Sequence, residues 1–350
     1  MRKTEPLEDE DDDVGRVLSL QSHVVHGYVG NKSAVFPLQL LGFDVDIVNT
    51  VQFSNHTGYA SFTGEKLDGD QLCNLMDGLD ANDLMSSYTH LLTGYAGTKS
   101  FVEAIVKVAT RLKSKNPDLV YVCDPVLGDN NKLYVPKELV KVYSEDVVPL
   151  ANVLLPNQFE AELLSGIKIE CEKDALKVCE TLHDRGPSII VITSLSLTDD
   201  DDDDDNEGEI LMLLSHREKD SRHAYIVRVP RLDSYFTGTG DLTAALMLGY
   251  LGKGFTSNQA LEMTASSVRG VTQVLTQILR KPSFRARTQV HAVLRRTCNY
   301  EARMAKKAKA SGEIRTRRPS RTVPPPELRL IQSRDDLLSP PPLLRAVKLL

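Results

Sequence analysis

The feature that most limits the fold of this chain is an alternation of short β-rich runs with stretches of helical patterning. In the first part of the chain, the β-rich runs are residues 16–22, 43–50, 90–94, 119–124, 152–155 and 189–194. The helical stretches are residues 30–41, 70–84, 99–115, 136–146, 158–165 and 172–184. Strands joined through helices form βαβ units, which assemble into parallel sheets covered on both faces. We therefore predict an α/β fold, a three-layer α/β/α sandwich with a mostly parallel central sheet.

The pattern changes after residue 198. Seven consecutive aspartates occupy residues 199–205, and strand candidates follow at 209–215 and 224–230. Like charges repel one another, so we predict a surface loop that joins a strand to a hairpin. A site for a divalent ion or a basic partner is one interpretation of the loop, and a solvated low-complexity insertion is the favoured one. Helical patterning resumes at residues 241–251 and 257–279.

The net charge of −6 combines two oppositely charged parts of the chain. Residues 280–350 carry 18 Lys and Arg against 5 Asp and Glu, a charge of +13, and the rest of the chain carries −19. We expect an acidic, disordered leader at 1–14 and a basic insertion or linker at 280–326, partly helical or disordered. Alternation in residues 327–332 predicts one last strand, and residues 337–350 are expected to be a disordered tail.

The basic stretch allows two interpretations. One is a surface for nucleic acid or nuclear import, and the other is an insertion at a loop. Because aromatic side chains are not interleaved with the basic ones, the insertion is favoured and no nucleic-acid partner is expected.

Composition and cysteine usage limit the class of protein. Hydrophobic residues make up 41% and charged residues 26%, which excludes a wholly disordered or fibrous chain. The five cysteines are odd in number and form no CxxC pair, so free thiols in a reducing compartment are expected. No apolar signal-peptide core follows the N-terminal charges, and no run of apolar residues is long enough to span a membrane. We expect a cytoplasmic protein.

The strongest local motif is Gly238-Thr239-Gly240-Asp241, which leads directly into an apolar helical stretch. Free backbone N–H groups at a helix start can bind an anion, and glycine lets phosphate approach the backbone closely. Asp241 lies in the first turn, where the helix dipole favours a carboxylate that can accept a proton. The alternative is an ordinary helix start, because Asp is common there.

Acidic and polar side chains follow three of the predicted strands. Asp124 and Asp129 follow the apolar run 119–123, where paired carboxylates beside phosphate suit Mg²⁺, or where Asp simply caps a turn. Asn157 and Glu160 share one face of a helix start, so Glu160 reaches a metal directly or through water, or the two form a capping box. Hydroxyls at Thr193 and Ser194 end the third of these strands, where they meet phosphate or cap the sheet edge.

The joint placement of these motifs is more informative than any one of them. In a parallel sheet, all the carboxyl ends of the strands face one crevice. Carboxylates, an amide, hydroxyls and a glycine cradle in one crevice are typical of phosphoryl transfer from a metal-bound nucleotide. The chain contains no GxxxxGK[ST] motif, which excludes a P-loop enzyme.

Several motifs together give the chain a family resemblance. They are SLQSHVVHGYVGNKSAVFPLQLLGFDVD, VNTVQFSNHTGY, LLTGY, VYVCDPVLGD, PNQFEAELLSG, VITS and GTGDLTAALML. The chain resembles the pyridoxal kinase family, within the ribokinase-like superfamily. The match runs from about Arg16 to Gln277 and resumes at 327–336, which implies a kinase domain of residues 15–279 plus 327–336. The first two motifs distinguish the pyridoxal branch from other kinases of the superfamily.

The resemblance implies a role for each matching residue. Asp241 matches the general base that acts on the 5′-hydroxyl of pyridoxal. The residues implied in pyridoxal binding are Ser22, Val51, Phe53, Thr57, Tyr95 and Asp241. Those implied in ATP binding are Asp124, Tyr134, Asn157, Glu160, Thr193, Ser194, Gly238, Thr239 and Gly240. The implied metal ligands are Asp124, Asp129 and Glu160, which would hold Mg²⁺ or another divalent cation. Tyr134 matches a residue of a flap that closes over the substrates.

The expected activity is ATP-dependent phosphorylation of pyridoxal, and also of pyridoxine and pyridoxamine, by a homodimer. Close relatives often carry Thr at the position of Leu155, and its oxygen helps to bind a monovalent cation. Leucine has only its backbone carbonyl to offer, so activation by K⁺ or Na⁺ is an open question. Two other functions stay open: a hydroxymethylpyrimidine-type kinase of the same fold, and a catalytically weak protein that binds pyridoxal phosphate.

Overall fold

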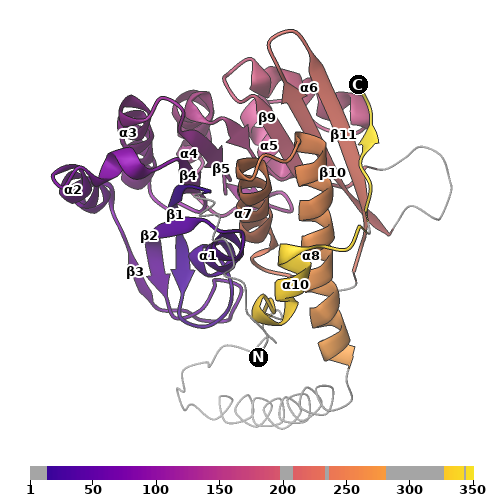
Figure 1. The fold of residues 1–350 in the computed structure, drawn as a ribbon, viewed down its shortest axis with the longest axis horizontal. Helices are drawn as coiled ribbons and strands as arrows, with labels where there is room; N and C mark the ends of the chain where they lie inside the picture. The colour runs from indigo at the N-terminus through magenta and orange to yellow at the C-terminus, as the bar shows by residue number, and fades with distance from the viewer. Residues whose placement is uncertain (1–13, 198–207, 233–235, 281–326, 343) are drawn as a thin grey trace, which may run out of the picture.

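A ten-stranded sheet forms the centre of the molecule (Figure 1). The structure, a computed structural model, describes residues 14–197, 208–232, 236–280, 327–342 and 344–350. The strand order is β12-β11-β10-β9-β8-β5-β4-β1-β2-β3. The six strands from β9 to β2 are parallel to one another, whereas β3, β10, β11 and β12 pair antiparallel. The predicted mostly parallel sheet is confirmed.

The element bounds are close to the predicted ones through residue 280. The strands are β1 (Arg16–Val24), β2 (Asp44–Phe53), β3 (Gly64–Lys66), β4 (His90–Thr93), β5 (Val120–Cys123), β6 (Gly128–Asp129), β7 (Lys132–Leu133), β8 (Val153–Leu154), β9 (Ile189–Leu195), β10 (Glu209–Arg217), β11 (Arg222–Pro230) and β12 (Val347–Lys348). The helices are α1 (Asn31–Leu40), α2 (Gly69–Asp80), α3 (Lys99–Lys115), α4 (Glu138–Val142), α5 (Gln158–Ser165), α6 (Glu172–His183), α7 (Thr239–Gly252), α8 (Ser257–Arg280) and α10 (Arg334–Leu338).

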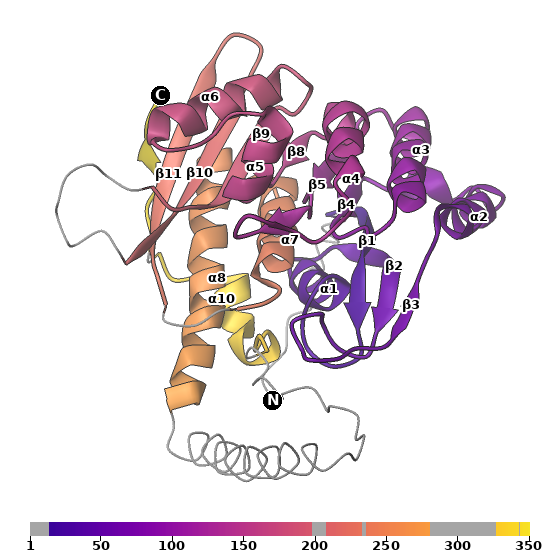
Figure 2. The same ribbon diagram turned by 180° about the vertical axis from the view of Figure 1, so that it is seen from behind.

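Helices cover both faces of the sheet, as Figures 1 and 2 show from opposite sides. Successive strand residues alternate between two cores, because side chains in a strand point to opposite faces. In β5, Tyr121 and Cys123 pack in the core beneath α2 to α6, whereas Val122 packs in the core beneath α1, α7 and α8. The chain therefore has the predicted three-layer α/β/α architecture.

The helix α3 shows how the local sequence fixes an element. The Thr98 hydroxyl accepts a hydrogen bond from the backbone N–H of Phe101 at 3.3 Å and caps the helix start. Phe101, Ile105, Val108 and Leu112 recur at helical spacing and are buried in one stripe. The predicted and observed bounds of this helix are the same.

The C-terminal segment differs from the prediction. Residues 327–332 are not a strand: an irregular stretch passes into a short 3-10 turn at Ile331–Ser333 and then into α10. Leu328 and Leu330 produce the strand-like alternation, but they are buried against helices in the core beneath α7 and α8. The expected disordered tail at 337–350 is also wrong for its described residues, because Leu337 is buried and β12 pairs with β11.

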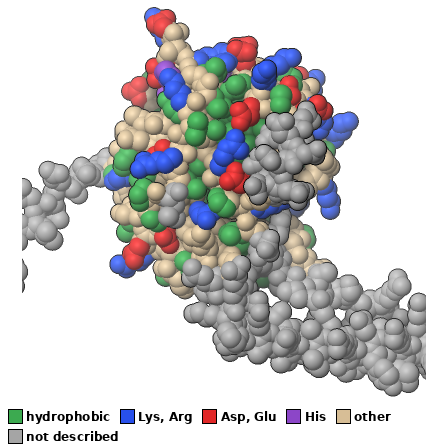
Figure 3. Space-filling view, turned by 90° about the vertical axis from the view of Figure 1, so that its right-hand side faces the viewer, with side chains coloured by type: hydrophobic (Ala, Val, Ile, Leu, Met, Phe, Trp, Pro, Cys, Tyr) green, Lys and Arg blue, Asp and Glu red, His purple; other side chains and the backbone are tan. Residues whose placement is uncertain are grey.

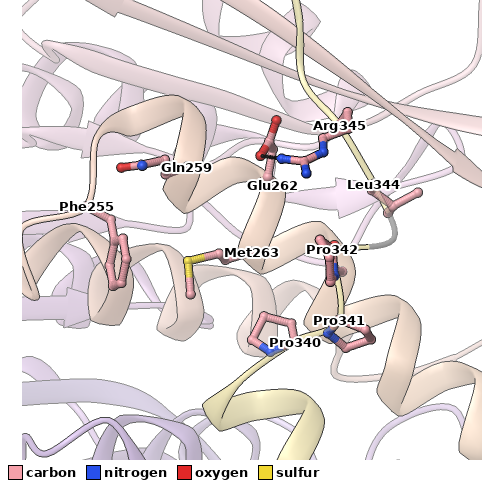
Figure 4. Close-up of a pocket in the computed structure, with 10 residues that line it drawn as sticks. Phe255, Gln259, Glu262, Met263, Pro340, Pro341, Pro342, Leu344 and Arg345 are labelled. Carbon is pink, nitrogen blue, oxygen red and sulfur yellow. Dashed lines mark ion pairs between the residues drawn. The ribbon is translucent and has the colours of Figure 1, made fainter.

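The tail packs along α8 and leaves a cavity of about 210 Å³ between the two (Figure 4). Phe255 and Met263 line one side, and Pro340 and Leu344 line the other. Glu262 holds the tail, since its carboxylate accepts the Ala346 N–H at 2.8 Å and lies 3.5 Å from the Arg345 guanidinium. This cavity lies away from the carboxyl ends of the parallel strands, so it is no part of the predicted site.

The face on the right of Figure 1 carries acidic and basic side chains interspersed, as Figure 3 shows. Ion pairs join the hairpin β10–β11 to α6: Arg217 lies 2.7 Å from Asp184, and Arg222 lies 2.7 Å from Glu180. Exposed pairs of this kind contribute little to stability, about 0–1 kcal/mol each. These pairs belong to a solvent-exposed surface of mixed charge.

Some predictions fall on residues outside the described ranges. These are the leader up to residue 13, the seven-aspartate loop at 199–205 and the basic stretch at 281–326. Among the described cysteines, Cys73, Cys123, Cys171 and Cys179 are free thiols. None of the helices in the described part of the chain has the length and apolar character needed to cross a bilayer.

The packing of the C-terminal segment leads to a prediction. Leu337→Ala should lower the free energy of unfolding by about 2–5 kcal/mol, because the Leu337 side chain is fully buried. The neighbouring Leu338 is exposed, so Leu338→Ala is a matched control that should change it by less than about 0.5 kcal/mol. Urea unfolding of both variants measures the difference. Equal, small effects would mean that the segment does not pack as described.

Candidate active site

The carboxyl ends of the parallel strands form one edge of the sheet, and nearly all the predicted site residues lie there. β1 has β2 on one side and β4 on the other, so the strand order reverses direction between β1 and β4. Ligands of open α/β sheets bind at such a reversal, outside the carboxyl ends of the strands. Ser22 lies near the end of β1, and Tyr95 follows β4. The fold therefore places the predicted pyridoxal-binding residues at the expected crevice.

A small apolar cluster lies at this edge, separate from the two main cores. It contains the buried side chains of Val24, Val29, Val51 and Phe53, with Tyr95 packed against them. Three of these residues were predicted as walls of the pyridoxal pocket, and the structure brings them together. Apolar walls with a few polar groups are typical of sites for small organic ligands.

Glu160 organises the loop after β5. Its carboxylate accepts hydrogen bonds from the backbone N–H groups of Leu127 at 2.8 Å, Gly128 at 3.2 Å and Asn157 at 2.9 Å. The Asn157 side chain accepts the Glu160 N–H, so the capping box of α5 is present. Burial raises the pKa of Glu160 to about 7, although these N–H donors oppose the rise. Glu160 thus holds the Gly128 loop in place, and both its oxygens are occupied in doing so.

Asp124 is a buried carboxyl group surrounded by like charge. The hydrogen bonds among the described residues give its carboxylate no donor. Burial raises its pKa well above the ordinary value, and Glu160 and Asp241 raise it further. A buried carboxylate without a partner is costly, so the arrangement suits a bound cation.

Asp241 lies in the first turn of α7, next to the glycine cradle. Gly238 precedes the helix with φ of 88°, and a Cβ there would overlap the carbonyl oxygen of Tyr28. A Cβ added at Gly240 would lie 3.7 Å from the Asp124 carboxylate, which brings the cradle and Asp124 together. Burial raises the pKa of Asp241, while a hydrogen bond from the Gly30 N–H partly opposes it. A raised pKa brings a carboxylate nearer to the range of an effective general base.

The remaining predicted residues are placed less closely. The Thr193 N–H donates to the Pro156 carbonyl at 2.9 Å, and Ser194 lies beside it, partly buried. Asp129 accepts hydrogen bonds from the backbone and side chain of Asn130, at 2.8 and 2.9 Å. Thr57 and Tyr134 are exposed. No hydrogen bond among the described residues joins Thr57 to the buried carboxyl groups.

The fit of a divalent cation can be tested on these residues. Among the described residues, no three Asp, Glu, His or Cys side chains are positioned to hold a metal ion by themselves. Mg²⁺ rarely needs such a cage, since it keeps water molecules and takes oxygens from substrate phosphates. The Asp124 carboxylate, which has no hydrogen-bond donor among the described residues, fits this use, whereas the Glu160 carboxylate already accepts three N–H groups, which favours contact with a cation through water.

Leu155 is a core residue. Its side chain is buried beneath α7 with Leu92, Val122 and Val191 of neighbouring strands. Its backbone N–H donates to the Cys123 carbonyl at 2.9 Å, in line with the sheet. The Leu155 side chain therefore contributes packing and presents no polar atom at this position.

Gly30 lies in the candidate site but is absent from the predicted residues, although the sequence carries a signal for it. Gly30 ends the β1–α1 loop with φ of 55°, and a Cβ there would overlap the Ser22 carbonyl oxygen. This backbone lets its N–H reach Asp241. A glycine between a strand and a helix is the same signal that identified Gly238, so the pattern was present. The wall residues Val24 and Val29 had no comparable signal.

Comparison with known proteins identifies the family. Pyridoxal kinase of Arabidopsis thaliana is 53% identical over 264 residues, covering 74% of this chain and 82% of its own length. Pyridoxal kinase of Homo sapiens is 46% identical, covering 74% and 84%, and that of Ovis aries is 42% identical, covering 95% and 98%. The chain belongs to the pyridoxal kinase family. A family model described as phosphomethylpyrimidine kinase matches residues 88–281.

Solved pyridoxal kinases have the same architecture. The structure from Leishmania donovani in complex with ADP and pyridoxine has a TM-score of 0.77 and 31% sequence identity, covering 97% of this chain and 100% of its own. The complex of that enzyme with ADP and pyridoxamine gives a TM-score of 0.75, covering 96% and 99%. The predicted fold class is confirmed.

The uncompensated charge of Asp124 leads to a prediction about stability. Without Mg²⁺, Asp124→Asn should raise the free energy of unfolding by about 0.5–2 kcal/mol at alkaline pH, because it removes a buried charge beside Glu160 and Asp241. The pKa of this carboxyl is raised on folding, so the native chain loses stability as pH rises through that pKa. The advantage of the variant should therefore shrink as pH falls. Unfolding curves between pH about 5.5 and about 8.5 measure it.

Asp129→Asn is the matched control for this prediction, because the Asp129 carboxylate is already satisfied by Asn130. It should change the free energy of unfolding by less than about 0.5 kcal/mol at any of these pH values. An Asp124 variant no more stable than the native chain at alkaline pH would show that the charge is compensated.

Proposed function

We propose that this chain transfers the γ-phosphoryl group of ATP to the 5′-hydroxyl of pyridoxal, and also of pyridoxine and pyridoxamine, giving the 5′-phosphates of vitamin B6 salvage. The observation that carries the proposal is the position of Asp241 at the start of α7, next to the glycine cradle and near the buried Asp124. Family membership and the apolar cluster of Val51, Phe53 and Tyr95 support the choice of substrate.

In the proposed mechanism, Asp241 accepts the proton of the 5′-hydroxyl as its oxygen attacks the γ-phosphorus. The Gly30 N–H faces the Asp241 carboxylate and favours its ionised form. The N–H groups of residues 238–240 stabilise the charge on the transferring group. Bond formation to phosphorus and cleavage of the bond to the leaving ADP oxygen then occur in one transfer. Ser22 and Thr57 are proposed to bind the pyridine ring.

A divalent cation is proposed beside Asp124. Glu160 and Asp129 are proposed to contact it through water or to hold the loop after β5 in position. When bound, the cation offsets the negative charge of the ATP phosphates. Asn157 positions the Gly128 loop, since its amide donates to the Gly128 carbonyl at 2.7 Å. Thr193 and Ser194 at the end of β9 are proposed to contact the nucleotide. Exposed Tyr134, in the loop after β5, is proposed to belong to a flap that excludes water.

The matching family model makes a pyrimidine kinase the second candidate function. The same chemistry would then act on a hydroxymethylpyrimidine. Offering both substrates to the enzyme in one assay decides between them, and a preference for the pyrimidine would replace the main proposal. A catalytically weak binding protein is the third possibility, and the presence of Asp124, Glu160 and the 238–241 cradle argues against it.

The decisive test of the mechanism is Asp241→Asn. With ATP, Mg²⁺ and pyridoxal, the native chain should form pyridoxal 5′-phosphate, and the variant should lose about 10²–10⁴-fold in kcat. Pyridoxal binding, measured by calorimetry, should be retained because the apolar cluster is untouched. Asp220→Asn, at an exposed position of the β10–β11 turn, is the control. Retained turnover would remove Asp241 as the base, and a folded native chain without activity would refute the function.

The packing of Leu155 leads to a prediction about monovalent cations. Because the Leu155 side chain fills the space with an apolar group, we expect turnover to change less than about twofold when K⁺ replaces tetramethylammonium. Initial rates at constant ionic strength measure this. Activation by K⁺ well beyond that factor would show that backbone carbonyls alone build the cation site.

We also propose that the enzyme is a cytoplasmic homodimer. Free thiols at the described cysteines support the compartment. Family membership supports the dimer, and exposed apolar side chains at Val25, Ile47 and Phe62 near the edge strand β3 are consistent with a contact surface. Sedimentation of the purified chain at micromolar concentration tests it, and a monomer would refute it.

A further inference from the structure

Glu327, at the start of the described C-terminal segment, lies against two loops of the candidate pyridoxal site. Its carboxylate accepts the backbone N–H of Tyr28 at 3.0 Å and the hydroxyl of Tyr59 at 2.9 Å. It also lies 3.3 Å from Nε2 of His56. Its partners are 268 and more positions away in the sequence. One distant side chain thus joins the loop after β1 to the loop after β2.

The loop after β2 carries Thr57, which is flanked by two of these contacts. The Nδ1 atom of His56 accepts the Gly58 N–H at 3.1 Å, so the proton of the neutral ring lies on Nε2, the atom that faces Glu327. The rings of His56 and Tyr59 pack edge to face, with centroids 4.7 Å apart. The His56 side chain is only 5% exposed, although its neighbour Thr57 is exposed. Glu327 therefore fixes the buried side of a loop whose other side is free to bind.

The loop after β1 leads from Glu327 to the reacting groups. The Tyr28 N–H bonds to Glu327, and the Tyr28 carbonyl lies against Gly238 of the cradle. Two residues further on, the Gly30 N–H binds Asp241. Gly27 has φ of 100°, and a Cβ there would overlap the Glu327 carboxylate. The path from Glu327 to the proposed base thus consists of one short backbone segment.

Glu327 is suited to this position as a carboxylate. Burial raises its pKa, but His56, the Tyr28 N–H and the Tyr59 hydroxyl outweigh burial and hold the pKa below its ordinary value. Its side chain is 16% exposed, so these charge-assisted contacts are only partly screened by solvent. The group stays ionised at neutral pH.

We propose that Glu327 is a positioning residue for the kinase reaction, which holds the 54–59 and 25–30 loops so that pyridoxal and Asp241 meet in the reacting geometry. This rests on the proposed function. Glu327 contacts the loops after β1 and β2 directly and the glycine cradle only through Tyr28, so its effect should be larger on the vitamin substrate than on ATP. Groups that orient the residues in contact with a ligand commonly affect function by about 10–100-fold.

The test compares Glu327→Ala with Glu327→Gln in the full chain. For Glu327→Ala, we expect kcat/KM for pyridoxal to fall about 10–100-fold, with the KM for ATP changed less than about twofold. The Tyr28 N–H and the Tyr59 hydroxyl donate to different oxygens of Glu327, and Glu327→Gln keeps one acceptor oxygen, so it should recover part of the loss. In the Glu327→Gln background, Tyr59→Phe should cost less than it costs alone.

A matched control separates positioning from loss of stability. Glu262→Ala also removes a carboxylate that binds a backbone N–H and holds the C-terminal tail, but it lies on α8, away from the two loops. It should lower the melting temperature without changing either KM. If Glu327→Ala changes only the folded fraction and leaves kcat/KM per folded molecule intact, the inference is refuted.

Amide hydrogen exchange tests the inference without turnover. The Tyr28 and Gly58 amides should exchange faster in Glu327→Ala than in the native chain, and Glu262→Ala should leave them unchanged. Unchanged protection at both amides would refute the positioning role of Glu327 even if the native chain proved inactive on pyridoxal. A native chain that is inactive but shows the exchange difference would refute the proposed function alone.

Discussion

The buried carboxylate of Glu160 is the interaction on which the rest of the site depends. It accepts hydrogen bonds from the N–H groups of Leu127, Gly128 and Asn157. It thus connects the loop after β5 to the start of α5, which follows the neighbouring strand β8. Three donors on one buried carboxylate fix a loop that has little regular structure of its own. With that loop fixed, Asp124 at its start stays close to Glu160 and to α7. The carboxyl groups of Asp124, Glu160 and Asp241 concentrate negative charge there, and no described counter-charge offsets it. This negative charge would attract the cation of a metal-bound nucleotide.

Two glycine-led helix starts meet on the other side of the same crevice. Gly30 precedes α1 and Gly238 precedes α7, and both have positive φ. Each is in contact with the other's loop, because the Gly30 N–H reaches Asp241 and Gly238 packs on the Tyr28 carbonyl. The proposed general base and the proposed anion cradle therefore form one structural unit. A side chain at either position would push the two helix starts apart. This accounts for glycine at both positions without invoking contact with a ligand.

Most of the fold could be predicted from the sequence because its signals are local. The helices at 99–115 and 158–165 follow from capping residues and apolar spacing within the segment itself. The last segment could not be predicted, since alternation at Leu328 and Leu330 is satisfied equally by a strand and by an irregular stretch packed on helices. The site divides in the same way. Asp124, Glu160 and Asp241 follow strand ends or begin helices, whereas Glu327 has no local pattern that connects it to Tyr28 or Tyr59.

The position of Glu327 in the sequence has a consequence for how the protein is made. The ribosome synthesises β1, β2 and the whole parallel sheet before it reaches Glu327, Leu328 and Leu330. Domains begin to fold during synthesis from the N-terminal side, so a nascent chain can form its sheet while the two vitamin-facing loops still lack their shared carboxylate. A premature stop codon between α8 and Glu327 would release a protein that contains Asp124, Glu160 and Asp241. That protein would lack the Glu327 carboxylate that joins the loops after β1 and β2. Completion of the site therefore waits until the segment that begins at Glu327 has been synthesised.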